Sequence, residues 1–362
     1  ISTTKPQAVR LLTSDADFWD VVSSYCRSAG ILFELERPES HCKSRRRSFS
    51  GAVRVFLALS LWSFRALAQT ALAKLLIRDK LPRPTADGEL CAFYTQYPSL
   101  WLGAQGERDE KYQEVPDLVY RLGGIPVFYA CTFATDDVHQ RVSLRAYYRL
   151  CQWLRERRQR TSGVHVHLVD RDLRWIDLIR VLVAGVAITF KHLCLESRGA
   201  FRRQWVIDGV DVFPLLRREL RVATYRIPRY VLHLVRMRRF INRAKLSCFV
   251  TYLFEFCYGR AMVYAAKTAT MAPLVIGSQE GPISKRRLQC IFASGELFRD
   301  STCNDNFVDN IPVPDHILLE GEAARGVLLE SGYPPARLHV LGAPRVGRLA
   351  SIQRKRRCTS AS

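Results

Sequence analysis

The sequence lacks the short motifs by which several large enzyme classes are identified. It contains no G-x-x-x-x-G-K-[ST] phosphate loop, no G-x-G-x-x-G dinucleotide fingerprint, no G-x-S-x-G nucleophile elbow and no H-E-x-x-H pair. It also has no internal repeat and no low-complexity segment. Phosphate-loop hydrolases, simple dehydrogenases and serine hydrolases therefore lose support as functional classes.

Paired cysteines and long apolar runs are missing too. The eleven cysteines are scattered, odd in number and without a C-x-x-C pair, which argues against a disulfide framework and against a zinc knuckle. The longest apolar run, Val181 to Phe190, is shorter than the ~20 residues of a membrane-crossing helix. Residues 1–30 show no signal peptide. These features predict a cytoplasmic protein with reduced thiols.

Acidic residues are scarce relative to basic ones. The chain has 34 Asp and Glu against 55 Lys and Arg, which gives a formal net charge of +21. With 48% hydrophobic and 25% charged residues in 362, the composition is that of a globular protein with a core. Such a charge favours anionic partners, among them phospholipid head groups, nucleotide diphosphates and nucleic acid.

The basic residues gather in three groups, which are Lys43–Arg47, Arg155–Arg160 and Arg217–Arg243. In the third group the arginines alternate with apolar residues, a pattern suited to an anionic membrane surface. An ordinary solvated helix face is the competing interpretation. Nucleic acid is disfavoured, because the sequence carries no helix-turn-helix, zinc-finger or RNA-binding signature.

Strand and helix patterns alternate along the chain. A short βαβ-like unit is predicted first, with strands at Val9–Leu12 and Ile31–Glu36 on either side of an amphipathic helix at Asp15–Ala29. A basic linker, Arg37–Ser50, precedes a long helix at Val53–Leu76. This composition predicts an internal boundary at the linker.

From residue 89 the alternation continues with longer helices. A loop through Gly103 and Gly106 separates the first strand from the helix after it, and a mainly helical region is predicted from Asp172 to about Arg243. Strands separated by helices of this length predict an α/β fold with a doubly wound, mostly parallel sheet. The predicted strands are Cys91–Tyr97, Val127–Cys131 and His165–Val169, and the predicted helices are Tyr112–Leu122 and Val142–Arg157.

The most informative stretch lies near the end of the chain. The segment PDHILLEGEAARGVLLESGYPPARLHVLGAPR, Pro314 to Arg345, predicts one further βαβ step. Its expected elements are a strand at His316–Leu319, a helix at Glu322–Leu329 stopped by Gly332, and a strand at Leu338–Leu341. Gly321 and Gly342 stand where a strand gives way to a turn, which predicts positive φ or close packing at both.

This stretch resembles the GT-B-like glycosyltransferases of bacterial surface carbohydrate (O-antigen, lipopolysaccharide or capsule) biosynthesis, in the part that closes their acceptor-side domain. The resemblance is fainter at Val250–Lys267, where these proteins carry a glutamate before a helix, and at Ile276–Pro282, IGSQEGP. It implies a Rossmann-like N-terminal domain, a nucleotide-sugar donor, no cofactor, and a lipid-linked or saccharide acceptor. Glu280 replaces the histidine of the family's Gln-His-Gly.

The resemblance also implies that a second, donor-binding domain is largely missing from this chain, which begins at Ile1 and ends in a basic tail, residues 346–362. The predicted division of the chain is 1–36 for the short N-terminal unit, 37–88 for the linker and long helix, and 89–345 for the acceptor-side domain.

Candidate site residues follow the strands at their carboxyl ends, where open α/β sheets bind ligands. Glu280 and Glu255 are the candidate catalytic bases. The competing interpretations are a turn residue for Glu280 and an ion pair with Arg260 or Lys267 for Glu255. The candidate substrate-binding residues are Gln279, Gly281, Lys285, Arg286 and Arg345, whose cations would balance an anionic substrate or leaving diphosphate.

The sequence VHVHLVD places His165 and His167 on one strand face, with Asp170 and Asp172 beyond. A third neighbouring ligand is not apparent, so core or edge histidines are predicted in preference to a metal site. The functional expectation is a sugar-transferring enzyme, peripheral on the inner face of the cytoplasmic membrane. A non-catalytic polyanion-binding protein and an inactive truncated remnant remain as alternatives.

Overall fold

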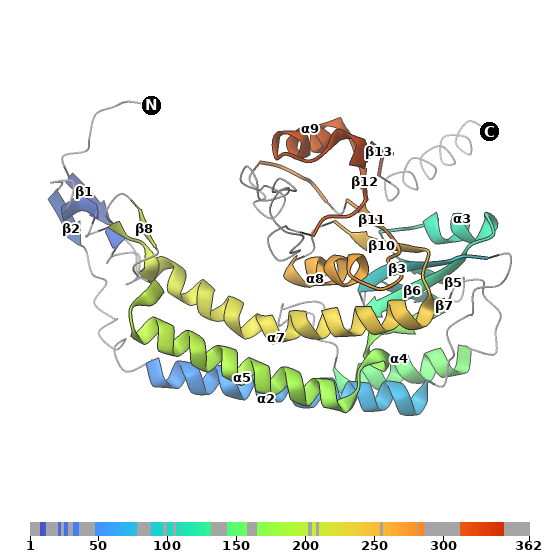
Figure 1. The fold of residues 1–362 in the computed structure, drawn as a ribbon, viewed down its shortest axis with the longest axis horizontal. Coiled ribbons are helices and arrows are strands. Elements are labelled where there is room, and N and C mark those ends of the chain that lie inside the picture. The colour runs from blue at the N-terminus through green and yellow to red at the C-terminus, as the bar shows by residue number, and fades with distance from the viewer. Residues whose placement is uncertain are drawn as a thin grey trace, which may run out of the picture. The chain divides into compact units, whose positions relative to one another are not determined.

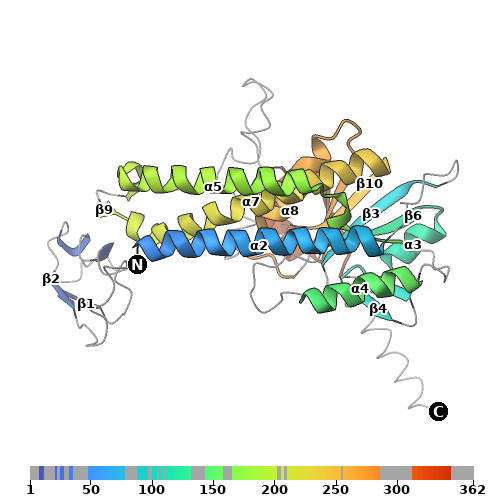
Figure 2. The same ribbon diagram turned by 90° about the horizontal axis from the view of Figure 1, so that it is seen from below.

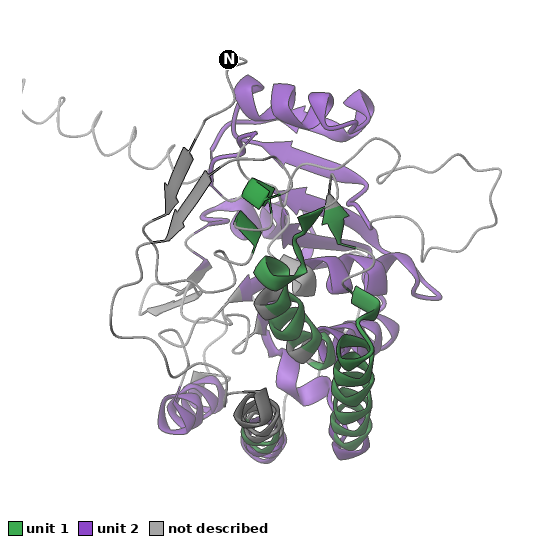
Figure 3. Cartoon of the chain, turned by 90° about the vertical axis from the view of Figure 1, so that its left-hand side faces the viewer, with its two compact units in different colours: residues 1–64, 179–229 green, residues 65–178, 230–362 purple. Residues whose placement is uncertain are grey.

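A computed structural model gives the architecture of the chain, which divides into two compact units (Figure 3). The larger unit comprises residues 65–178 with 230–362, and the smaller one residues 1–64 with 179–229. The division at residues 36, 88 and 345 stays a prediction. The structure describes residues 8–11, 21–22, 25–27, 32–35, 48–77, 88–96, 100–103, 106–109, 111–131, 143–157, 165–201, 205–207, 210–253, 256–279, 281–285 and 312–343.

The larger unit is built on a parallel sheet that, within the described residues, has seven strands in the order β13-β12-β11-β10-β3-β6-β7 (Figure 1). Numbered along the chain from β3, this is 3-2-1-4-5-6 with a seventh strand added, the strand order of Rossmann-type sheets. The predicted α/β class with a parallel sheet is confirmed. The strands are β3 (Leu90–Gln96), β6 (Ile125–Cys131), β7 (His165–Leu168), β10 (Cys248–Tyr252), β11 (Leu274–Ser278), β12 (His316–Leu319) and β13 (Leu338–Val340).

Helices α3 (Val115–Arg121), α4 (Leu144–Arg157), α8 (Phe256–Lys267) and α9 (Glu322–Glu330) connect these strands. The chain winds outward from β3 to β7 and, in the opposite direction, from β10 to β13. Right-handed crossovers then require the helices of the two halves to cover opposite faces. Every residue of Ala92–Tyr94 and of Val127–Ala130 is buried, as strands covered on both faces should be.

The predicted C-terminal βαβ step is present as β12, α9 and β13, with its own buried cluster around Ile317, Leu328 and Leu338. Gly332 ends the helix with φ of +87°, which only glycine adopts readily. Gly342 has the same φ, as predicted.

Gly321 does not follow the prediction made for it. Its φ is −175°, an extended conformation open to any residue, and a Cβ at this position would meet no atom within 4 Å. Neither positive φ nor close packing therefore explains this glycine.

One hairpin of the larger unit was not predicted. β4 (Leu100–Gly103) and β5 (Gly106–Asp109) form an antiparallel hairpin, where a loop through Gly103 and Gly106 was expected. Gly103 and Gly106 form the last residue pair of the hairpin. Each strand has only four residues, which is too short to show the alternating apolar pattern of a strand.

The smaller unit contains the predicted parallel strand pair, β1 (Ala8–Leu11) and β2 (Leu32–Leu35). A short hairpin, β8 (Val206–Ile207) with β9 (Val210–Asp211), was not predicted.

Three long helices have residues in both units: α2 (Ser48–Leu76), α5 (Trp175–Ser197) and α7 (Phe213–Ala244) (Figure 2). α2 begins inside the predicted basic linker, since Ser48 to Ser50 are already helical.

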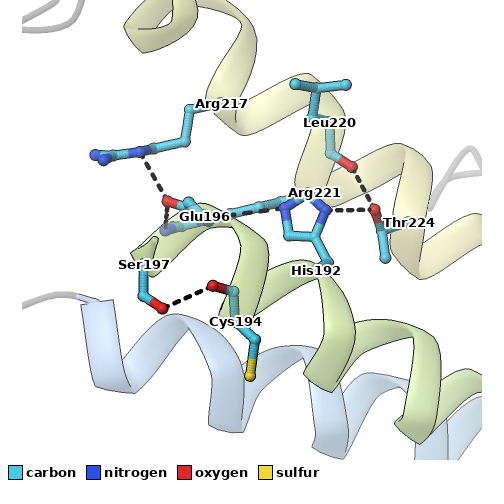
Figure 4. A network of polar contacts seen from close by, with 8 residues as sticks. All are labelled: His192, Cys194, Glu196, Ser197, Arg217, Leu220, Arg221 and Thr224. Atoms are coloured by element: carbon cyan, nitrogen blue, oxygen red, sulfur yellow. Dashed lines mark hydrogen bonds and ion pairs between the residues drawn. The ribbon is translucent and has the colours of Figure 1, made fainter. Parts of the chain in front are cut away.

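Within the smaller unit, α5 and α7 are joined by a polar network around Glu196 (Figure 4). Its carboxylate, only 7% exposed, pairs with Arg217 at 2.9 Å and with Arg221 at 2.5 Å. One turn away, the ring of His192 bonds the hydroxyl of Thr224 at 2.9 Å. Two arginines of the basic stretch are thus paired with a carboxylate of a neighbouring helix.

Candidate functional site at the carboxyl edge of the sheet

The sheet has its topological switch point between β3 and β10. These strands are hydrogen-bonded neighbours, and the chain leaves them in opposite directions across the sheet. In doubly wound folds the loops beyond such a point separate and leave room for a ligand. A ligand site is therefore expected beyond the carboxyl ends of β3 and β10, at Gln96 and Tyr252.

A buried carboxylate, that of Asp109 at the end of β5, lies at this point. It accepts a 2.7 Å hydrogen bond from the hydroxyl of Tyr252 and another from the hydroxyl of Thr95. The backbone N–H groups of Lys111 and Tyr112 donate to its other oxygen at 2.8 and 3.1 Å. Asp109 thus links the ends of both switch-point strands to the segment that enters α3.

Aromatic rings surround this carboxylate. Tyr112 stacks on Tyr252 with a centroid separation of 5.0 Å, and its hydroxyl donates to the carbonyl of Tyr94 at 2.9 Å. Tyr94 meets Tyr252 edge to face at 5.7 Å. The Nζ of Lys111 lies 4.1 Å from the centroid of the Tyr252 ring, a cation–π distance. The three tyrosine rings thus form a packed aromatic cluster, with the ammonium group of Lys111 beside it.

The buried environment raises the pKa of both central groups, the Asp109 carboxyl and the Tyr252 phenol. Burial raises the pKa of the Asp109 carboxyl above its ordinary value, against the effect of the hydrogen bonds from Thr95, Tyr252, Lys111 and Tyr112. Burial also raises the pKa of the Tyr252 phenol well above its ordinary value, so Tyr252 remains the donor of the pair. This arrangement can hold a proton and fix the strand ends in position.

Asp109, Thr95 and Tyr252 belong to no short motif and were not predicted as site residues. The available signal was weak: a polar residue at the end of an apolar strand, in FYTQ for Thr95 and in FVTY for Tyr252. Nothing in the sequence pairs these strand ends with Asp109.

Two predicted site residues lie beyond β11. The side-chain amide of Gln279 accepts a 2.8 Å hydrogen bond from the N–H of Glu320 and donates one of 2.8 Å to the carbonyl of Gly281. Gln279 thus ties the end of β11 to the end of β12. Gly281 has φ of +81°, in the left-handed region that favours glycine, so the chain turns sharply here.

Lys285 follows this turn and forms a 2.5 Å ion pair with Glu330, both side chains being mostly exposed. Four other predicted site residues, Glu255, Glu280, Arg286 and Arg345, lie outside the described residues. In the chain Glu255 and Glu280 closely follow β10 and β11, which pair through Tyr252 and Ser278 at their last positions.

His167 in β7 and the two aspartates that follow the strand, Asp170 and Asp172, belong to a buried structural network. His167 is buried, bonds the carboxylate of Asp172 at 2.8 Å and stacks on Phe240, as a core histidine does. Asp170 is paired with Arg236 at 3.0 Å. Among the residues that the structure describes, no group of three His, Cys, Asp or Glu could hold a metal ion.

Comparison of the chain with protein-family models, with curated proteins and with solved structures found no match.

Proposed function

We propose that this protein is a GT-B-type glycosyltransferase of surface carbohydrate biosynthesis, which moves a sugar from a nucleotide-sugar donor to a lipid-linked or saccharide acceptor. The observation that supports this proposal best is the Rossmann strand order, with a buried polar network at its switch point. Folds of this type bind nucleotides and sugars beyond the carboxyl ends of the strands. The C-terminal unit β12-α9-β13 adds the segment whose sequence carries the resemblance.

In the proposed reaction, Glu280 or Glu255 accepts the proton of an acceptor hydroxyl as its oxygen attacks the anomeric carbon of the donor sugar. The bond between that carbon and the diphosphate oxygen breaks, and the electron pair leaves with the nucleoside diphosphate. Lys285, Arg286 and Arg345 would stabilise the negative charge of this leaving group.

Asp109 is assigned a positioning role. Its hydrogen bond to Tyr252 anchors the last residue of β10, three residues before Glu255. A base must be placed within hydrogen-bond reach of the proton that it takes, so a movement of about 1 Å at this strand end would slow the reaction. Loss of the anchor should therefore lower kcat more than it raises KM.

The experiment is to incubate the full chain with a panel of nucleotide sugars and a lipid-linked acceptor extract, and to measure release of the nucleoside diphosphate. The variants are Glu255→Gln and Glu280→Gln, with the exposed Glu322→Gln as a matched control. We expect one of the first two to lose at least about 100-fold in kcat, as removal of a general base does. Full activity in both would refute the assigned bases, and no turnover with any donor would favour the inactive remnant over the proposed transferase.

Polyanion binding is the weaker alternative, because it rests on the net charge alone and five arginines of the basic stretch are paired with carboxylates. The basic stretch has carboxylate partners on other elements, which neutralise part of its charge. Nucleic-acid binding through many phosphate contacts would weaken steeply with salt, whereas nucleotide-sugar binding would not. The ion pairs are Arg217 and Arg221 with Glu196, Arg236 with Asp170, Arg239 with Asp177, and Arg243 with Asp172.

A further inference from the structure

Helix α5 leaves an apolar stripe open to solvent. Ile179, Val183, Val186 and Phe190 are 48%, 63%, 41% and 69% exposed. Their spacing of four, three and four residues places them along one side of the helix. In the same unit, α2 exposes Leu61 (70%) and Phe64 (68%). Apolar residues exposed singly need no explanation, but a continuous stripe of this kind marks an interaction surface.

The charges on α5 are divided between two sides. Arg180 and Lys191 are exposed, and because they are eleven residues apart, about three turns, they lie on the same side of the helix. Each follows a stripe residue directly, which places the two cations along one flank of the stripe, roughly 100° around the helix. Their alkyl stems can lie along the stripe while the charged ends reach outward.

The acidic residues of α5 do not reach this surface. Glu196 is engaged by Arg217 and Arg221 (Figure 4), and the buried Asp177 is engaged by Arg239. Among the described residues of α5, the exposed charged side chains are therefore all cations. An apolar stripe with a purely basic flank is the pattern by which helices bind anionic lipid surfaces.

We propose that α5 is the membrane-docking surface of this protein and lies in the plane of an anionic bilayer. The stripe Ile179, Val183, Val186 and Phe190 would enter the boundary between head groups and acyl chains. Arg180 and Lys191 would contact anionic head groups. The proposal stands apart from the sugar transfer, because docking requires neither donor nor acceptor.

Two other occupants fit the surface less well. A second copy of the chain packed face to face would bring the same cations together around a two-fold axis, in a protein that already carries +21. Insertion across a bilayer is compatible with the length and composition of α5, which has 23 residues and reaches a mean hydropathy of 1.8. Crossing would however require the ion pairs of Asp177 and Glu196 to be broken, since they tie α5 to α7.

The test is flotation of the full chain with phosphatidylcholine vesicles that contain or lack phosphatidylglycerol. Two double variants separate the apolar and the charge contributions: Val183→Glu with Phe190→Glu, and Arg180→Glu with Lys191→Glu. The control is Leu122→Glu at the end of α3, a leucine that is 78% exposed. Circular dichroism checks that each variant is folded, which the exposure of all these positions favours.

We expect binding to the anionic vesicles, at least about tenfold weaker in each double variant and unchanged in the control. Equal binding by the apolar double variant and the unaltered chain, or equal binding to neutral vesicles, would overturn the proposal. A dimer in the absence of vesicles that the apolar variant abolishes would assign the stripe to a second copy. Resistance to extraction by alkaline carbonate would show a crossing helix. Either result would also overturn in-plane docking.

Discussion

The hydroxyl of Tyr252 donates a 2.7 Å hydrogen bond to the carboxylate of Asp109, a residue 143 positions earlier in the chain. Both side chains are buried, so water cannot take the place of either partner. The bond connects the end of β10 to the end of β5, and the hydroxyl of Thr95 in β3 donates to the same carboxylate. The geometry of the switch point thus depends on one buried carboxylate.

Removing this bond should destabilise the larger unit. We expect Tyr252→Phe to cost about 1–3 kcal/mol, because it leaves a buried carboxyl group with one donor fewer. A double-mutant cycle with Asp109→Asn, measured by denaturant unfolding, should give a coupling energy of about 1 kcal/mol or more. Tyr120→Phe on the exposed side of α3 is the control and should change stability by less than about 0.5 kcal/mol. Strict additivity of the two buried variants would contradict this account.

Asp315 should stabilise the fold in a pH-dependent manner. Burial acts to raise the pKa of this carboxyl, but the hydrogen bonds from Lys267 and from the N–H of Val275 outweigh it and hold the pKa below 3.8. Its contribution is therefore present above pH 3.8 and is lost as the pH falls through the lowered native value.

We accordingly expect Asp315→Asn to cost about 1–2 kcal/mol near neutral pH and less as the solution is acidified. Unfolding curves of both proteins over a pH series measure the difference. The control is Glu322→Gln, whose partner Arg325 is a surface residue. A difference independent of pH would show that Asp315 acts through packing rather than through its charge.

The buried ion pair of Arg236 and Asp170 should be sensitive to loss of one partner. The side chains are 1% and 0% exposed, and Asp170 also accepts a hydrogen bond from Tyr147 at 2.9 Å. Arg236→Met should cost about 3–5 kcal/mol, because it leaves a buried carboxylate without this cation. Adding Asp170→Asn should restore part of the loss, and Arg325→Met at the surface should have little effect. If the second substitution makes the loss larger, the charge explanation fails.

Two glycines should respond in opposite directions to alanine. A Cβ at Gly277 in β11 would lie 2.9 Å from Pro314 and 3.0 Å from Leu253, so Gly277→Ala should cost about 1–3 kcal/mol through overpacking. A Cβ at Gly326 inside α9 would meet no atom within 4 Å, so Gly326→Ala should stabilise by about 0.5–1 kcal/mol. Thermal unfolding of both variants distinguishes them, and a shift of the same sign in both would contradict the packing described here.

Cys91 and Cys248 occupy facing positions on the neighbouring strands β3 and β10. The hydrogen bond between their thiols lowers the pKa of Cys248 and raises that of Cys91. Cys248 should therefore react with iodoacetamide before Cys91, while Cys151, buried and with its pKa raised to about 12, should react slowly.

A mild thiol oxidant should join the two facing cysteines, because adjacent strands place their Cα atoms about 5 Å apart, within the range of a disulfide. Peptide mass spectrometry follows both reactions. Faster alkylation of Cys91 than of Cys248 would contradict the assigned hydrogen bond.

The sequence by itself determined much of the local structure. The limits of α2 at Leu76, of α4 at Arg157 and of β12 at His316 and Leu319 follow from apolar periodicity and from breaking residues, because such signals are local. The turn at Gly281 and the helix stop at Gly332 follow for the same reason, since a left-handed backbone there requires glycine.

The tertiary structure alone decided which side chains meet. The arginines of Arg217–Arg243 were predicted to face a membrane or solvent, and the fold pairs several of them with carboxylates on other elements. Asp109 carried no signal of its own, and it acquires its environment only when β5 is brought beside the ends of β3 and β10. The burial and the partners of a charged group are set by segments remote in sequence, so its pKa and its role cannot be predicted from its neighbours along the chain.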